Sequence, residues 1–86
     1  MSFENQTVVV TGAAGNLGAA VATAFHGEDA RVILVDAKME FLDSRFPEAD
    51  PRYVKVAVDL LDAGAVGRSF SAIQDQFGGI DALCAI

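Results

Sequence analysis

Continuous apolar runs alternate along the chain with segments whose apolar positions recur every three or four residues, which predicts strands and helices in turn. Residues 8–11 and 32–35 are uninterrupted aliphatic or β-branched runs, typical of parallel strands that are covered on both faces. A helix is expected between them over residues 16–27. Its predicted apolar stripe, at i, i+4, i+7 and i+8, consists of Leu17, Val21, Ala24 and Phe25.

The same alternation continues in the second half of the chain. A short helix is expected over residues 38–45, before Pro47, because a proline disfavours helical geometry in the residue that precedes it. Residues 53–58 alternate, with three valines on one side, which predicts a half-exposed edge strand. These elements repeat the order of strand and helix seen in the first half.

A third helix is expected between Asp62, which can cap its start, and Gly78, which ends it. Its apolar stripe consists of Val66, Phe70, Ile73 and Phe77. Residues 80–86 begin as another apolar strand. Four strands and three helices in strict alternation predict an α/β fold with an open, doubly wound parallel sheet in the strand order 3-2-1-4.

Composition and charge narrow the class of protein. Twelve acidic and six basic side chains give the 86 residues a formal charge of −6, and no basic run is present, so nucleic acid is not an expected partner. The longest apolar stretch is far shorter than the roughly 18 residues of a membrane span. The N-terminus lacks the basic start and apolar core of a secretory signal. A cytoplasmic protein without membrane association is therefore expected.

The single cysteine and the single histidine suggest no chemistry of their own. Cys84 excludes an internal disulfide, and its apolar neighbours favour a reduced, buried thiol over a reactive one. His26 falls at the end of the first expected helix, where the helix dipole accounts for it without catalysis. We expect no metal site, because one histidine, one cysteine and scattered carboxylates form no ligand cluster.

Residues 11–18 join the first strand to the first helix through the pattern Gly-x-x-Gly-x-x-Gly. Glycine adopts backbone dihedrals that other residues avoid, and the absent side chains let phosphate oxygens approach the backbone N–H groups. The helix that follows points its positive end at such an anion. A nucleoside-triphosphate loop is disfavoured because no lysine follows the glycines. The expected diphosphate contacts are Gly12, Gly15, Asn16, Leu17 and Gly18.

Asp36 directly follows the second strand and lies 24 residues after Gly12. That spacing is near the roughly 20 residues expected between a glycine loop and a carboxylate that binds an adenosine ribose. A solvated turn residue or a helix cap is the alternative interpretation. Because a carboxylate repels the 2′-phosphate of NADP and accepts from the free hydroxyls of NAD, NAD is expected rather than NADP. Lys38 is in reach of a 2′-phosphate, although a solvated lysine is the simpler interpretation.

These landmarks, in this order, resemble the short-chain dehydrogenase/reductase family over the whole chain. Residues 11–18 resemble its Thr-Gly-rich cofactor loop, and Asp36 matches its ribose acceptor. Asp59 and Leu60 resemble its adenine contact after the third strand, with a strand-end cap as the alternative for Asp59. Residues 81–84 resemble the lead-in to the family's Asn-Asn-Ala-Gly segment.

The chain departs from the family pattern at two places. Gly15 sits one position earlier than the middle glycine of the commonest pattern, as in extended or atypical members. Ala85 and Ile86 stand where the two asparagines align, so only the backbone of Ala85 is expected beside the adenosine ribose.

The resemblance implies a Rossmann-like sheet that is incomplete here, with residues 1–86 as the N-terminal part of a single NAD(P)-binding domain. It implies an oxidoreductase that transfers hydride between a nicotinamide cofactor and a carbonyl or alcohol of a small-molecule substrate. The family's Tyr-x-x-x-Lys pair is absent, since Tyr53 is followed by Lys55 and is interpreted as an edge-strand surface residue. We therefore assign no catalytic residue, and expect the chain alone, without a C-terminal catalytic half, to be inactive.

Two other functions fit the same landmarks: a non-catalytic dinucleotide-binding or sensor module, and a fragment of an extended-type nucleotide-sugar epimerase or dehydratase. An apolar fourth strand left at the edge of a sheet is a template for pairing. We therefore expect the chain to be marginally stable alone and to form a homo-oligomer through that edge.

Overall fold

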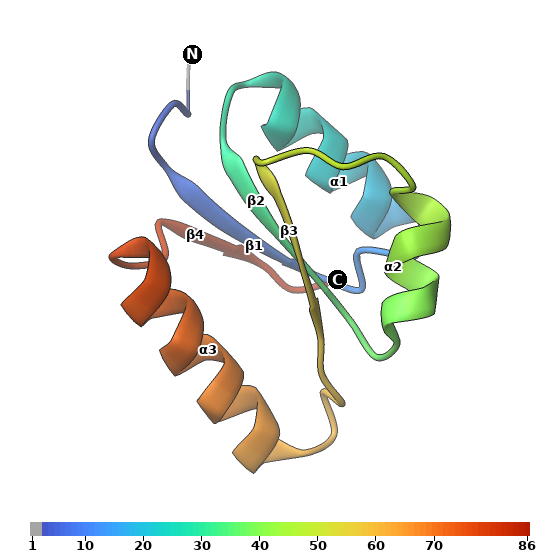
Figure 1. The fold of residues 1–86 in the computed structure, drawn as a ribbon, viewed down its shortest axis with the longest axis vertical. Helices are drawn as coiled ribbons and strands as arrows, with labels where there is room; N and C mark the ends of the chain where they lie inside the picture. Colours follow the sequence, from blue (N-terminus) through green and yellow to red (C-terminus); the bar gives the residue numbers. More distant parts are fainter. Residues whose placement is uncertain (1–2) are drawn as a thin grey trace.

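The computed structural model describes residues 3–86 as three layers, with a parallel sheet between helices on its two faces (Figure 1). The strands are β1 (Thr7–Thr11), β2 (Arg31–Asp36), β3 (Tyr53–Ala57) and β4 (Ala82–Cys84). The helices are α1 (Asn16–Gly27), α2 (Met39–Arg45) and α3 (Ala63–Phe77). The strand order is β3-β2-β1-β4 with every pair parallel, which confirms the predicted α/β topology.

The pairing register brings the carboxyl ends of all the strands to one edge of the sheet. Val35 lies opposite Thr11, Asp36 opposite Ala57, and Cys84 opposite Val10. The chain moves outward from β1 through β2 to β3 and then returns to the other side of β1. In sheets of this kind, ligands bind outside the carboxyl ends of the strands at the point where the order reverses. That point lies between β1 and β4.

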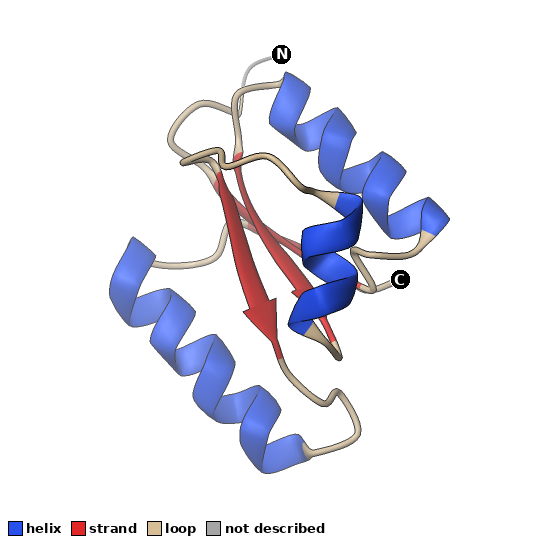
Figure 2. Cartoon of the chain, turned by 45° about the vertical axis from the view of Figure 1, so that its right-hand side comes forward, coloured by secondary structure: helices blue, strands red, loops and turns tan. Residues whose placement is uncertain are grey.

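Alternate residues of the two central strands face opposite helical layers. One face packs against α1 and α2, and the other packs against α3. Figure 2 shows α3 separated by the sheet from the other two helices. The aliphatic runs of β1 and β2 are buried, as their uninterrupted apolar sequence predicts. The strand residues on the α1 and α2 face are Val8, Val10, Val32 and Leu34. Those on the α3 face are Val9, Ile33 and Val35.

Helix α1 buries a different face from the predicted one. Its buried residues are Gly18, Ala19 and Ala22. Leu17 is 64% exposed and Ala24 is also exposed, whereas Val21 and Phe25 pack at the margin of the core. The predicted stripe is thus wrong for two of its four members. Nine of the twelve positions of this helix are apolar or glycine, so spacing distinguishes its faces poorly, and the small residues allow a closer approach to the sheet.

Helix α3 has the predicted apolar face and the predicted ends. Ile73 is its buried residue, and Val66, Phe70 and Phe77 pack around the same cluster. The Ala65 backbone N–H donates to Asp62 Oδ1 at 3.0 Å, which caps the first turn. At the other end, a left-handed residue, Gly78, terminates the helix. Cys84, in the short strand that follows, is half-buried rather than buried as predicted.

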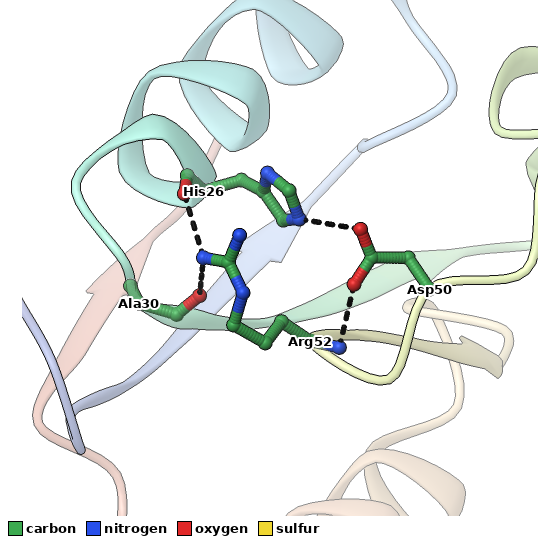
Figure 3. Close-up of polar contacts among 4 residues, drawn as sticks. All are labelled: His26, Ala30, Asp50 and Arg52. Carbon is green, nitrogen blue, oxygen red and sulfur yellow. Dashed lines mark hydrogen bonds and ion pairs between the residues drawn. The ribbon is translucent and has the colours of Figure 1, made fainter.

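Tyr53 is also half-buried, which corrects its interpretation as a surface residue. Its ring stacks on His26, with centroids 4.1 Å apart, and meets Phe46 at 5.0 Å. His26 Nε2 lies 2.8 Å from Asp50 Oδ2, and the Arg52 guanidinium donates to the His26 carbonyl at 2.8 Å (Figure 3). The Arg52 backbone N–H donates to Asp50 Oδ1, and this bond, assisted by His26, lowers the pKa of Asp50. This cluster joins the end of α1 to the start of β3.

Within residues 3–86, no helix combines the length and the apolar character needed to cross a membrane.

Candidate functional site

The turn between β1 and α1 is fixed by close backbone contacts. Gly12 has φ +64°, in the left-handed region that favours glycine. A Cβ on Gly18 would lie 2.1 Å from the Gly12 carbonyl oxygen, so only glycine allows α1 to start against this turn. The Gly15 N–H donates to the same carbonyl at 3.1 Å. The turn therefore depends on the absence of side chains at two of its three glycines.

The start of α1 is open and positive. Gly15, Asn16 and Leu17 are exposed, and the first turn of the helix carries no acidic residue. The first N–H groups of a helix have no acceptor within it, and the helix dipole adds positive charge at the same point. Backbone donors at such a terminus suit a diphosphate.

Asp36 reaches from the tip of β2 to the glycine turn. Its Oδ2 accepts from the Ala14 N–H at 3.0 Å, and its Oδ1 accepts from the Ala37 N–H at 2.8 Å. It is not the cap of the next helix, because Lys38 occupies the N-cap position of α2 without a side-chain bond. Each carboxylate oxygen retains further acceptor capacity. The side chain is thus held beside the turn and is still able to accept from a hydroxyl.

A pocket of about 620 Å³ lies between the glycine turn and α2. Its lining residues are Ala14, Gly15, Asp36, Phe41, Ser44 and Arg45. Arg45, which ends α2 and bonds to the turn, is not among the site residues predicted from the sequence. Its Nε donates to the Ala14 carbonyl at 3.2 Å, and its Nη2 donates to Asn16 Oδ1. No local signal in the sequence indicates this contact, since it joins residues about 30 positions apart.

The residues after β3 lie at the same edge but outside this pocket. The Val58 N–H donates to the Asp36 carbonyl at 2.9 Å, which holds the segment beside β2. Asp59 Oδ1 accepts from the Leu61 N–H at 2.9 Å, so its carboxylate supports the turn into α3. Leu60 is 43% exposed. Asp59 thus caps the backbone after β3. Contact of Asp59 and Leu60 with adenine stays a prediction.

Thr11 links the end of β4 to the glycine turn. Its hydroxyl accepts from the Ile86 N–H at 3.1 Å and donates weakly to the Cys84 carbonyl at 3.5 Å. A Cβ on Gly12 would lie 3.5 Å from the Ile86 carbonyl oxygen. Ala85, between these bonded residues, is consequently held beside the turn on the β4 side of the site.

The residues that the structure describes include no cluster of three or more His, Cys, Asp or Glu side chains able to hold a metal ion. The site consists instead of backbone donors, the Asp36 carboxylate, the Arg45 guanidinium and an adjacent pocket, which suits an organic anion.

Comparison with known proteins identifies the family. The sequence pattern of the short chain dehydrogenases matches residues 6–85. The chain belongs to this family. Members of the short-chain dehydrogenase family use nicotinamide cofactors.

Two curated relatives and two solved structures illustrate the relationship. Sorbitol dehydrogenase of Cereibacter sphaeroides is 31% identical over 83 residues, which cover 96% of this chain and 32% of that protein. Meso-2,3-butanediol dehydrogenase of Serratia marcescens is 35% identical over 86 residues, covering 96% of this chain and 34% of that protein. The chain thus spans about a third of the length of these relatives.

The solved structures show the same partial coverage. A short chain dehydrogenase from Bacillus anthracis superposes with a TM-score of 0.89 at 26% identity, covering 99% of this chain and 35% of that one. A short-chain dehydrogenase/reductase from Brucella melitensis gives 0.84 at 34% identity, covering 96% and 37% of the two chains. These superpositions confirm the predicted Rossmann-like fold and the family resemblance.

Proposed function

We propose that this chain binds NAD, as the cofactor-binding portion of an oxidoreductase that acts on a carbonyl or an alcohol. The position of Asp36 carries the proposal, because its carboxylate lies against the glycine turn and beside the pocket of about 620 Å³. A carboxylate there suits a ribose with free hydroxyls, and its charge opposes a 2′-phosphate.

The residues present fit a dinucleotide in other respects. The glycine turn and the N–H groups of Asn16 and Leu17 supply donors for the diphosphate. We propose that Leu60 and the backbone of Ala85, at the same sheet edge, contact the adenosine. The carboxylate of Asp36 is the feature that favours NAD over NADP.

Bound NAD would supply hydride acceptance or donation at its nicotinamide ring. This chain's own residues would bind and orient the cofactor, and we assign proton transfer to residues outside these 86. The position of Tyr53 supports this assignment, because Tyr53 begins β3 and stacks on His26. It therefore lies at the amino end of the strands, whereas the candidate site lies at their carboxyl ends. The relatives named for sorbitol and meso-2,3-butanediol support an alcohol as the substrate of the complete protein.

We also propose that the chain associates with a second copy through β4. This strand pairs with β1 on one side, and Leu83 is 52% exposed. Within the described residues β4 is an edge strand of the sheet, and an apolar edge strand favours pairing with another strand.

Calorimetric titration with NAD and with NADP tests the cofactor proposal. Asp36→Ala should weaken NAD binding about tenfold or more, since a charged hydrogen-bond acceptor is lost. Asp36→Asn, which removes the charge and nearly keeps the shape, should bring the affinities for NAD and NADP closer together. Asp43→Ala, a change on α2 away from the pocket, is the matched control. Unchanged NAD affinity in Asp36→Ala would rule out the ribose assignment.

A further inference from the structure

We propose that Arg45 is a positioning residue for the cofactor: from the end of α2 it holds the glycine turn in the shape that receives the diphosphate. The inference rests on the proposed function, because it concerns the same turn, but it assigns a role to a residue that need not touch the ligand. The observation behind it is that side chains from β2 and α2 hold both polar atoms of one residue, Ala14.

Ala14 is held at its N–H and at its carbonyl. Asp36 Oδ2 accepts from the N–H at 3.0 Å, and Arg45 Nε donates to the carbonyl oxygen at 3.2 Å. Ala14 immediately precedes Gly15, the N-cap of α1. The two bonds therefore restrict the peptide groups on either side of Ala14, next to the N–H groups proposed to bind the diphosphate at the helix start.

The second nitrogen of the Arg45 fork extends the contact into the helix. Its Nη2 donates to Oδ1 of Asn16, the first residue of α1. One planar guanidinium thus bonds to residues on both sides of Gly15. A lysine has a single ammonium on a flexible stem and does not reproduce this two-point geometry.

Helix α2 is itself anchored, which makes it a suitable support for Arg45. Leu42 is completely buried under the helix, and the Lys55 Nζ lies 2.9 Å from Asp43 Oδ1, which ties α2 to β3. Burial of Leu42 provides most of this anchoring, because the contact of Lys55 with Asp43 is exposed and an exposed ion pair contributes little. That contact does not touch the glycine turn. It therefore provides a matched control for loosening α2 alone.

Ordering a loop on binding costs free energy, so a turn that is already held binds more tightly. Loss of the Arg45 contacts should therefore weaken binding of the diphosphate while leaving the fold in place. If Arg45 instead attracted the diphosphate directly by its charge, a lysine at position 45 would preserve most of the affinity. A positioning role predicts that lysine does not.

Binding of ADP, which carries the adenosine and the diphosphate, tests the inference by calorimetry on the purified protein. We expect Arg45→Ala to weaken ADP binding about three- to tenfold, Arg45→Lys to weaken it nearly as much, and Lys55→Ala to leave it unchanged. Asn16→Ala should cost less, and its effect should largely disappear when Arg45 is already Ala. ADP affinity that is unchanged in Arg45→Ala, or restored in Arg45→Lys, would overturn the inference.

Amide hydrogen exchange of the protein without nucleotide tests the role of Arg45 independently of the proposed NAD binding. The Ala14 and Gly15 amides should exchange faster in Arg45→Ala than in the wild type and in Lys55→Ala, with unchanged protection in β1 and β2. If the wild type binds neither ADP nor NAD, the cofactor proposal fails, and the exchange rates still decide whether Arg45 holds the turn. Equal exchange at these two amides in all three proteins would refute that role.

Discussion

The carbonyl oxygen of Gly12 lies 2.1 Å from the place that a Cβ on Gly18 would occupy. No real Cβ tolerates a backbone oxygen at that distance, so α1 and the turn must separate if a side chain is added. Gly18→Ala should lower the free energy of unfolding by an amount at the upper end of the roughly 1–3 kcal/mol typical of overpacking. Urea unfolding checks this, and a loss below about 0.5 kcal/mol would show that the turn moves without cost.

Gly15 differs from Gly18, because its added Cβ would meet only the Gly12 carbonyl oxygen, at 3.4 Å. Gly15 is exposed and lines the pocket. Gly15→Ala should therefore change the free energy of unfolding by less than about 1 kcal/mol and still weaken NAD binding, since the methyl group enters the proposed ligand space. Parallel calorimetry and urea unfolding separate the two effects. Wild-type NAD affinity in this variant would place the diphosphate elsewhere.

The bonds at Asp50 predict a dependence of stability on pH. The Arg52 backbone N–H, assisted by His26, lowers the pKa of Asp50 from its ordinary value of 3.8 in the folded protein. The ionised form therefore contributes stability that is fully present above pH 3.8 and is lost as the pH falls through the lowered value.

Comparison of the wild type with Asp50→Asn tests that dependence. The difference between their free energies of unfolding should be largest near neutral pH and should shrink below pH 3.8. Urea unfolding at a series of pH values measures it. A difference that stays constant down to pH 2 would contradict the assignment.

Ile73 is the buried contact of α3 with the sheet, where it packs among Val9, Ile33 and Val58. Ile73→Ala should lower the free energy of unfolding by about 2–5 kcal/mol, because it leaves a cavity in that layer. Leu61→Ala, at a side chain that is 96% exposed, is the control and should change it by less than about 0.5 kcal/mol. Similar losses in both variants would show that α3 does not depend on this contact.

The sequence predicts most of the fold because its clearest signals concern burial and chain reversal. The aliphatic runs of β1 and β2 have no polar interruption, which indicates cover on both faces, and that cover is observed. Gly78 and the cap at Asp62 mark the ends of α3 for local reasons that do not depend on the rest of the chain. The position of Asp36 at the strand tip follows from the same local signals.

Other features depend on contacts between distant residues and leave no local signal. The face of α1 could not be predicted, because Leu17 and Ala22 look equally suited to a core until the sheet favours the smaller one. The stacking of Tyr53 on His26 and the bonds from Arg45 to the turn join segments that only the parallel sheet brings together. For the same reason the sequence alone indicates the carboxylate of the candidate site but not the cation that bonds to its turn.

The hydroxyl of Thr11 takes the place of main-chain pairing beyond the last residue of β4. Backbone bonding between β1 and β4 runs as far as Cys84, and the Ile86 N–H then bonds to an oxygen that belongs to a side chain. Alignment of Ala85 with the glycine turn therefore depends on one rotatable oxygen. Serine at position 11 would preserve that alignment, and valine, with the same shape, would release the end of the strand.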